Sequence, residues 1–205
     1  MEATALKINI QPTKKSRIHE IEEGLKNFGR VFSDHMYVID YLDGEWKDAR
    51  IVPYGDLPMS PATSALHYGQ AVFEGMKAYR NEADEILLFR ATDNLKRLNK
   101  SAVRLCMPEI PEELFMDGLK ELLKLDKNWI SQTEGASLYI RPFMFGTDEY
   151  IGVKPSESYR LIIFTNPVGH YYAKPVKVKV ETRFTRAAEG GVDRKSTRLN
   201  SSHLV

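Results

Sequence analysis

The first candidate for chemistry is a pair of side chains, Tyr139 and Arg141, in the apolar run SLYIRPFMFG. Successive side chains of a strand point to opposite faces, so Leu138 and Ile140 share one face and the polar pair shares the other. An arginine offers a planar fork of donors that suits a carboxylate or a phosphate, and a neighbouring tyrosine can bond the same group. The alternative is a surface cation beside a half-buried ring, and spacing alone favours that alternative.

A second candidate is the basic face of the helix that we expect over residues 93–105. Arg97, Lys100 and Arg104 lie on this face, away from the apolar stripe of the helix. Solvation explains such a face without any ligand. The alternative is that one of the three side chains binds an anion.

Aromatic residues also stand beside turn-forming residues in two places. Tyr68, Phe73 and Glu74 lie close to two glycines in SALHYGQAVFEG, and glycine permits tight turns or close approach of the backbone. Tyr171 and Tyr172 follow the turn signal NPVG. Such residues can line a cleft or simply pack a core, and the spacing leaves both interpretations open.

Several common kinds of site are absent from the sequence. The histidines, at positions 19, 35, 67, 170 and 203, have no close pairing at helical or strand spacing, so we expect no metal site. The P-loop, GxGxxG and GxSxG patterns are absent as well. The net charge of +1 gives no general attraction to nucleic acid or to an anionic membrane, so small-molecule partners fit better.

The composition predicts a folded, soluble protein. Hydrophobic residues make up 42% of the 205 residues, which is enough for a core, and no segment approaches the apolar length of a membrane span. The single cysteine, Cys106, cannot form an internal disulfide, which favours the cytoplasm. Because it lies between Leu105 and Met107, we expect it to be buried.

Two hairpins are expected in the first half of the chain. Residues 36–41 are rich in β-branched and aromatic types, and the turn dipeptide Asp43-Gly44 separates them from a second apolar stretch that ends at Val52. Residues 71–80 and 85–90 form a second pair of apolar runs around the polar segment NEADE.

Two helices and further strands follow. Apolar spacings of three and four predict a helix after Asp93, which we expect to be its N-cap. A second helix is expected to begin with Pro111 at its first position. Strands are expected over residues 137–146, 159–165 and 176–184. This order lacks regular βαβ alternation and predicts an α+β fold.

Several segments, taken in order, resemble the branched-chain amino acid aminotransferases, which are class IV pyridoxal-phosphate enzymes. The segments are FGRVFSDHMYV, SALHYGQAVFEGMKAYR, FRATDNLKRLNKSAVRL, SLYIRPFMFGTDEYIGV, NPVGHYY and TRAAEGGV, and together they run from about residue 28 to residue 192. The resemblance implies a fold of type IV, like that of D-amino acid aminotransferase. It also implies a homodimer, with the cofactor pyridoxal 5'-phosphate held between a small and a large domain.

The resemblance also implies a division of this chain and roles for its residues. Residues 1–166 match the small α/β domain, and residues 167–192 match the connector and first strand of the large domain. Arg97 matches the arginine that binds the cofactor phosphate, and Arg141 matches the arginine that receives the second carboxylate of glutamate. Positions that line the side-chain pocket or hold the substrate carboxylate match four aromatic residues: Tyr68, Phe73, Tyr139 and Tyr171. The substrates are then amino acids and 2-oxo acids, namely leucine, isoleucine or valine with 2-oxoglutarate.

The resemblance ends before the lysine that holds the cofactor as a Schiff base. By register that lysine falls at Ser196, and Lys195 stands one place early, which on a strand turns the side chain to the opposite face. We therefore expect no catalytic lysine, a truncated and inactive chain, and a disordered tail over residues 193–205. The alternative function is a non-catalytic module that dimerises or binds a partner.

Overall fold

The structure is a computed structural model, and it describes residues 7–170, 175–180 and 182. The chain divides into two units, Met1–Tyr171 and Tyr172–Val205. Within the first unit, one sheet has the strand order β1-β3-β2-β8-β7-β5-β6, and β4 pairs with β7 beside this path. Its strands are β1 (Asn9–Ile10), β2 (His35–Leu42), β3 (Glu45–Pro53), β4 (Ala71–Phe73), β5 (Met76–Arg80), β6 (Ile86–Leu88), β7 (Ser137–Gly146) and β8 (Tyr159–Val168). The pairs are antiparallel except β1 with β3.

The first predicted hairpin is confirmed as β2 and β3. Asp43 and Gly44 form its turn, with φ angles of 56° and 82°, and positive φ at both central residues matches the twist of the flanking strands. Strand β2 also pairs with β8, from Met36 opposite Phe164 to Tyr41 opposite Tyr159. This places β2 inside the sheet.

The second predicted hairpin is confirmed as β5 and β6, but the stretch before it is broken. Residues 71–80 form two strands, β4 and β5, that both pair with β7 and are separated by Glu74 and Gly75. At this break the backbone of Gly75 lies close to β7, because a Cβ there would collide with the Tyr139 hydroxyl. Only glycine lets the backbone approach this ring without displacing it.

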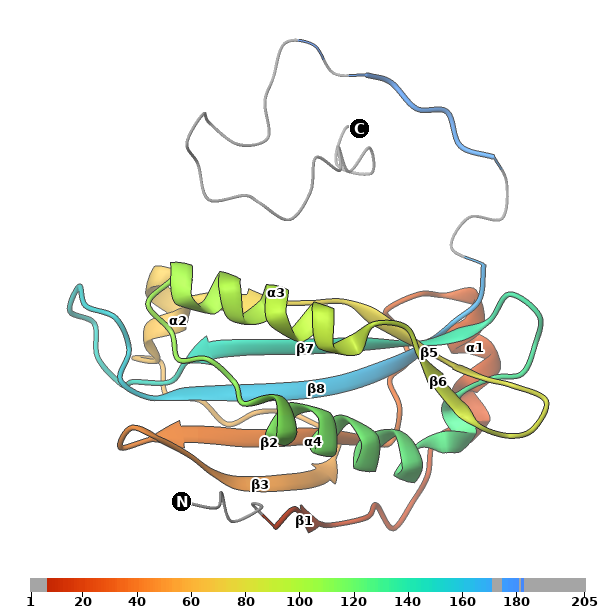
Figure 1. Cartoon of the computed structure of the whole chain (residues 1–205), viewed down its shortest axis with the longest axis horizontal. Helices are drawn as coiled ribbons and strands as arrows, with labels where there is room; N and C mark the ends of the chain where they lie inside the picture. Colours follow the sequence, from red (N-terminus) through yellow and green to blue (C-terminus); the bar gives the residue numbers. More distant parts are fainter. Residues whose placement is uncertain (1–6, 171–174, 181, 183–205) are drawn as a thin grey trace. The chain divides into compact units, whose positions relative to one another are not determined.

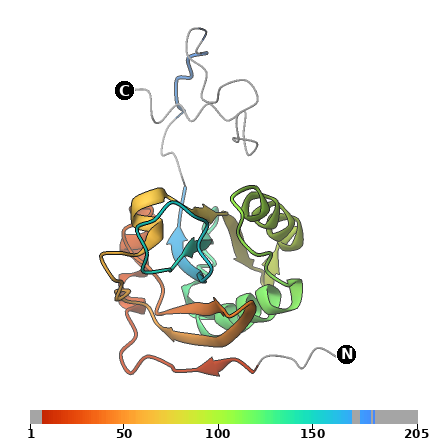
Figure 2. The same cartoon turned by 90° about the vertical axis from the view of Figure 1, so that its left-hand side faces the viewer.

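The two long helices, α3 (Ala91–Arg104) and α4 (Glu112–Leu125), pack against one face of the curved sheet, as Figures 1 and 2 show. The prediction that Asp93 caps α3 is wrong. The helix begins at Ala91, two residues before Asp93, and follows Arg90 in a left-handed conformation with φ 52°. Asp93 instead accepts a hydrogen bond of 2.5 Å from Arg90 Nε. Pro111 is the N-cap of α4 rather than its first residue, because its ψ of 137° is extended.

The shorter helices lie elsewhere: α1 (Ile21–Lys26), α2 (Ser64–Tyr68) and the 3-10 turns Ile18–Glu20 and Lys127–Trp129. The main core lies between the sheet and the two long helices, where Leu98, Leu119, Leu138 and Leu161 are almost completely buried. The smaller apolar cluster of the opposite face is built on Met36, Val38, Phe145 and Ile162. The two long helices on one face of a mostly antiparallel sheet confirm the predicted α+β fold.

The expectation that Cys106 is buried is wrong. The residue follows the end of α3 with φ 56° and is exposed. This left-handed turn sends the next side chain, Met107, into the core instead, where it is 4% exposed. An apolar neighbour on each side therefore did not determine the direction of the cysteine.

Strands β7 and β8 confirm the next two predictions, but β8 includes most of the NPVG signal. The Thr165 carbonyl accepts from the Ser33 N–H on the β2 side of the strand, and backbone groups two residues apart point the same way. The nitrogen of Pro167, which carries no hydrogen, therefore points toward β2. Because the pairing of β8 with β2 ends at Phe164, the proline costs the sheet no hydrogen bond.

The last predicted strand, residues 176–184, is not formed in the part that the structure describes. Residues 175–180 have no strand assignment, and residues 181, 183 and 184 lie outside the described residues. A strand needs a ladder partner for its backbone groups.

Among the described residues, no helix is long and apolar enough to cross a membrane.

Candidate active site

The alternation predicted for β7 is confirmed. Leu138 and Ile140 are 0% exposed on the helix-covered face, whereas Tyr139 and Arg141 are half-buried on the other face. Arg141 Nη2 donates a hydrogen bond of 2.8 Å to the Tyr139 hydroxyl. The two side chains therefore act together, as a guanidinium held at the edge of a phenol.

Phe73 joins this pair from β4. The Arg141 guanidinium carbon lies 4.4 Å from the centre of the Phe73 ring and 5.4 Å from the centre of the Tyr139 ring, which are cation–π distances. The structure thus brings together three of the residues predicted from the sequence. Their arrangement is a cation between aromatic walls, which can bind an anionic group beside an apolar one.

Phe28 extends the aromatic wall, and the sequence reasoning gave it no role. Its ring meets the Tyr139 ring edge-on, with centres 5.3 Å apart and an angle of 88° between the planes. The ring is 42% exposed. Its place at the start of the first family-like segment was the only signal that could have identified it.

Arg97 makes a bidentate ion pair that the sequence reasoning also did not predict. Its Nε and Nη2 donate to Glu74 Oε1 and Oε2 at 2.6 and 2.7 Å. The hydrogen bond to Glu74, which outweighs the cost of burial, raises the pKa of the Arg97 guanidinium, so this side chain stays charged.

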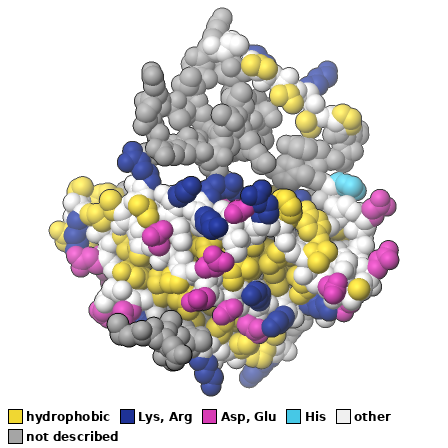
Figure 3. Space-filling model, in the orientation of Figure 1, with side chains coloured by type: hydrophobic (Ala, Val, Ile, Leu, Met, Phe, Trp, Pro, Cys, Tyr) yellow, Lys and Arg dark blue, Asp and Glu magenta, His cyan; other side chains and the backbone are white. Residues whose placement is uncertain are grey.

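Figure 3 shows Lys and Arg side chains gathered along α3, and in the structure Lys100 and Arg104 are exposed, as a solvated face requires.

The corner formed by Glu74 and Gly75 connects both groups of residues. The Glu74 backbone N–H donates to the Pro142 carbonyl at 2.9 Å, next to Arg141, and Gly75 packs against the Tyr139 ring. The Glu74 side chain holds Arg97 of α3. One corner of backbone therefore contacts β7 beside Arg141 and holds Arg97 of α3.

The two remaining predicted residues stand differently. Tyr68 ends α2, is 45% exposed, and donates through its hydroxyl to the Ile151 carbonyl. This bond ties α2 to the loop between β7 and β8. Tyr171 lies outside the described residues. No group of three or more potential metal ligands occurs among the residues that the structure describes.

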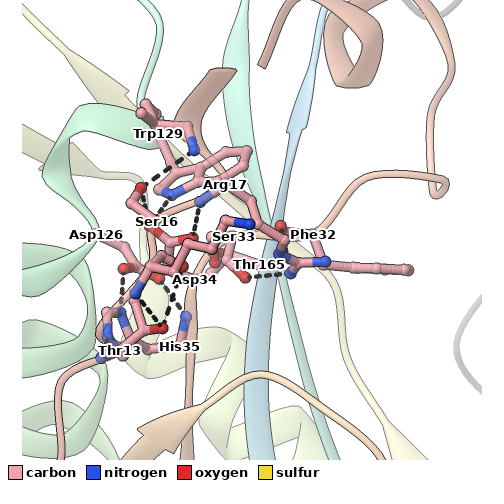
Figure 4. Close-up of polar contacts among 12 residues, drawn as sticks. Thr13, Ser16, Arg17, Phe32, Ser33, Asp34, His35, Asp126, Trp129 and Thr165 are labelled. Atoms are coloured by element: carbon pink, nitrogen blue, oxygen red, sulfur yellow. Dashed lines mark hydrogen bonds and ion pairs between the residues drawn. The ribbon is translucent and has the colours of Figure 1, made fainter. Parts of the chain in front are cut away.

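A buried polar cluster holds the N-terminal segment to the body of the fold (Figure 4). Thr13 N–H donates to His35 Nε2 at 2.8 Å, so the ring proton lies on Nδ1, which donates to Asp126 Oδ1 at 2.6 Å. Asp34 accepts from Arg17 N–H, from the hydroxyl of Ser16 and from the indole of Trp129, and its carboxylate belongs to the same cluster. The sequence reasoning missed this cluster, because its partners lie up to 95 residues apart.

Asp34 is charged in this cluster. Burial alone would raise the pKa of its carboxyl, but the bonds from Arg17, Ser16 and Trp129 outweigh burial, so that the net pKa lies below the ordinary value of 3.8. The carboxylate is therefore more stable in the folded protein than in water. It fixes residues 16 and 17 at the start of the described fold.

Residues 71–198, more than half of the chain, match the amino-transferase class IV family, and the chain belongs to that family. Among curated relatives it is 48% identical over 204 residues to branched-chain-amino-acid aminotransferase 2 of Bacillus subtilis, covering 98% of this chain and 55% of the relative. It is 45% identical over 193 residues to a probable branched-chain-amino-acid aminotransferase of Staphylococcus aureus, covering 92% of this chain and 53% of the relative. The resemblance found in the sequence is confirmed, and the chain spans about half the length of the curated relatives it matches.

Two solved structures are similar to part of this chain. The branched-chain amino acid aminotransferase of Escherichia coli aligns with a TM-score of 0.48 and 25% identity, covering 67% of this chain and 41% of that one. The branched-chain aminotransferase of the thermophilic archaeon Thermoproteus uzoniensis, solved with norvaline, aligns with a TM-score of 0.48 and 25% identity, covering 67% and 43%.

Proposed function

We propose that this chain contributes the substrate-recognising part of a branched-chain amino acid transaminase that uses pyridoxal 5'-phosphate. The reaction transfers an amino group between leucine, isoleucine or valine and 2-oxoglutarate. Family membership supports the reaction class, and the names of the curated relatives support the substrates. The single observation that carries the proposal is the Arg141 guanidinium packed between the rings of Phe73 and Tyr139.

This arrangement suits an enzyme that must accept two unlike side chains in turn. An aliphatic side chain needs apolar walls, which the aromatic rings supply, and a glutamate side chain needs a cation for its second carboxylate. Arg141 meets the second need. Its Nη2 donates to the Tyr139 hydroxyl, and its other N–H groups make no hydrogen bond within the described part of the chain, so they can bind a carboxylate. Tyr139 fixes the direction of the guanidinium, and the remaining N–H groups can donate to a carboxylate in a bidentate manner.

Arg97 is the residue that we assign to the cofactor phosphate. Its contacts with Glu74 use two of the five N–H donors of a guanidinium. The side chain is 48% exposed, so the remaining edge is open to a phosphate, whose oxygens match the donor fork. When bound, pyridoxal phosphate supplies an electron sink for the substrate α-carbon.

The aromatic residues are assigned to the substrate itself. We propose that Phe73 and Tyr139 contact its side chain, and that Tyr68 and Tyr171 complete the pocket or hold its carboxylate. The exposed rings of Tyr68 and Phe73 support contact with a ligand or with a further segment of protein. A homodimer, with sites shared between subunits, belongs to the same proposal.

A chimaera tests the assignment of Arg141. Residues 1–192 of this chain are joined to the remaining part of the Bacillus subtilis relative, and Arg141→Gln is introduced. Removal of the cation leaves a carboxylate unpaired, so we expect KM for 2-oxoglutarate to rise about tenfold or more while KM for leucine changes by less than about twofold.

The control is Lys77→Gln, because Lys77 is an exposed cation of the neighbouring strand β5 that makes no cation–π contact within the part of the chain that the structure describes. We expect it to change neither constant by more than about twofold. An equal rise of KM for 2-oxoglutarate and for leucine in Arg141→Gln would contradict the assignment. A chimaera that folds, binds the cofactor and transaminates none of these acids would contradict the proposed function.

A further inference from the structure

Glu74 is a buried carboxylate for which the proposed function has not yet given a purpose. Its side chain is 1% exposed, and burial of a charge is costly unless the charge is paired and hydrogen-bonded. Besides Arg97, it accepts from Asn94 Nδ2 at 3.2 Å and from its neighbour Gly75 N–H at 3.3 Å. The carboxylate is therefore fixed by the backbone corner and by the helix that carries Arg97.

This pairing determines the orientation of the Arg97 side chain. An arginine that is half exposed ordinarily samples many rotamers, and a ligand that binds it must then overcome the loss of this side-chain entropy. Glu74 holds the Nε and Nη2 edge of the guanidinium at 2.6 and 2.7 Å. The opposite edge, with Nη1 and the second hydrogen of Nη2, is consequently directed outward in a fixed plane.

Two opposite effects on anion binding follow from Glu74. Its negative charge repels a phosphate, and its geometry presents the arginine fork already ordered. The Arg97 side chain is 48% exposed, so a phosphate meets its open edge in solvent, where salt screens repulsion, whereas the Glu74 carboxylate is 1% exposed and is screened less. Pre-organisation is not screened, because it removes an entropy cost. Ordering is the effect that the bidentate geometry supports.

We propose that Glu74 is a positioning residue for cofactor binding, which holds Arg97 in the orientation that receives the phosphate, with Asn94 as the second support of the carboxylate. This inference rests on the proposed role of Arg97. It assigns to Glu74 an effect on phosphate recognition rather than on fold stability alone.

The first test compares two ligands that differ only by the phosphate. Binding of pyridoxal 5'-phosphate and of pyridoxal to the full 205-residue chain is measured by fluorescence for wild type and for Glu74→Gln. The amide keeps the size of the side chain but turns one acceptor into a donor that faces Arg97. We expect affinity for pyridoxal 5'-phosphate to fall about tenfold and affinity for pyridoxal to change less than about twofold.

The matched control is Asp40→Asn, which removes another carboxylate that pairs with an arginine through both oxygens, at 2.6 and 3.2 Å from Arg160. If Asp40→Asn selectively lowered the affinity for pyridoxal 5'-phosphate, breaking any such ion pair would weaken phosphate binding, and the inference about Glu74 would be overturned. So would unchanged or tighter binding of pyridoxal 5'-phosphate by Glu74→Gln, because charge repulsion would then be the larger effect.

The second test needs no cofactor. The ¹⁵N relaxation of Arg97 Nε reports whether the guanidinium is ordered, and we expect a rigid signal in wild type, a mobile one in Glu74→Gln and recovery in part in Glu74→Asp. A rigid Arg97 signal in Glu74→Gln would overturn the positioning role of Glu74 and would leave the proposed role of Arg97 intact. If wild type has a rigid Arg97 but binds both ligands equally, the phosphate role of Arg97 fails, and with it the phosphate part of this inference.

Discussion

At the scale of single residues, several polar side chains of this protein are held by partners that lie far away along the chain. The paired faces of Tyr139 and Arg141 follow from alternation within one strand, so a local pattern predicts them. Glu74 and Arg97 are 23 residues apart, and His35 and Asp126 are 91 apart. No local period connects such residues, because only the folded sheet and helices bring them together.

Asp34 offers a prediction at this scale that depends on pH. Its pKa is lowered in the folded state, so its stabilising contribution is fully present above the unfolded pKa of about 3.9 and is lost as pH falls through the folded value. In the Asn variant an NH₂ group, which donates, replaces one of the two carboxylate oxygens, so this side chain can no longer accept all the hydrogen bonds from Ser16, Arg17 and Trp129. We expect Asp34→Asn to lower the free energy of unfolding by about 1–3 kcal/mol at pH 7.

The measurement is urea unfolding of wild type and variant between pH 7 and pH 3. The difference between them is expected to shrink below about pH 4, where the wild-type carboxylate is itself protonated in the unfolded chain. Asp43→Asn is the control, because Asp43 lies in a turn with its side chain 88% exposed, and it is expected to cost less than about 0.5 kcal/mol. A difference that is constant with pH would contradict the role given to the Asp34 charge.

Most of the secondary-structure elements were predictable, because hydrophobic period and turn chemistry are local properties. The β2–β3 hairpin, α3, α4, β7 and β8 all follow the predicted patterns. Errors fall at their ends: α3 begins two residues before Asp93, and the left-handed residue Cys106 follows it. Backbone conformation at these ends depends on tertiary contacts, such as the burial of Met107, which a local pattern does not contain.

Helix α4 offers a prediction in which helix propensity and packing have opposite signs. Gly118 lies within α4, where replacement by alanine ordinarily stabilises a helix by about 1 kcal/mol. Here an added Cβ would collide with the ring of Tyr37, which is 0% exposed and donates through its hydroxyl to the Leu114 carbonyl at 3.1 Å. The ring has no room to move, so packing strain is the larger effect.

We therefore expect Gly118→Ala to lower the free energy of unfolding by about 1–3 kcal/mol, as overpacking does. Thermal and urea unfolding measure this change. Lys120→Ala on the exposed side of the same helix is the control for propensity, and we expect it to stay within about 0.5 kcal/mol of wild type. Stabilisation by Gly118→Ala would show that Tyr37 gives way, and that the contact between α4 and β2 is looser than described.

For the whole molecule, family membership was the property that the sequence made most accessible, since ordered segments along most of the chain carry it. Composition, charge and periodicity reached an α+β fold and excluded several classes of site, but they did not reach the reaction. The domain boundary near residue 166, the tail over residues 193–205, the homodimer and the cytoplasmic location stay predictions.

We predict that the 205-residue chain does not attach pyridoxal phosphate through Lys195. Ser196 stands where the resemblance places the lysine, and its hydroxyl cannot form the bond that an amine forms with an aldehyde. Lys195 stands one residue away, which on an extended strand reverses the direction of its side chain. Incubation with pyridoxal phosphate, reduction with borohydride and peptide mapping would then find no more label on Lys195 than on exposed lysines such as Lys120. Stoichiometric labelling of Lys195 that is abolished by excess leucine would contradict the prediction, because it would place a reactive amine at the substrate site.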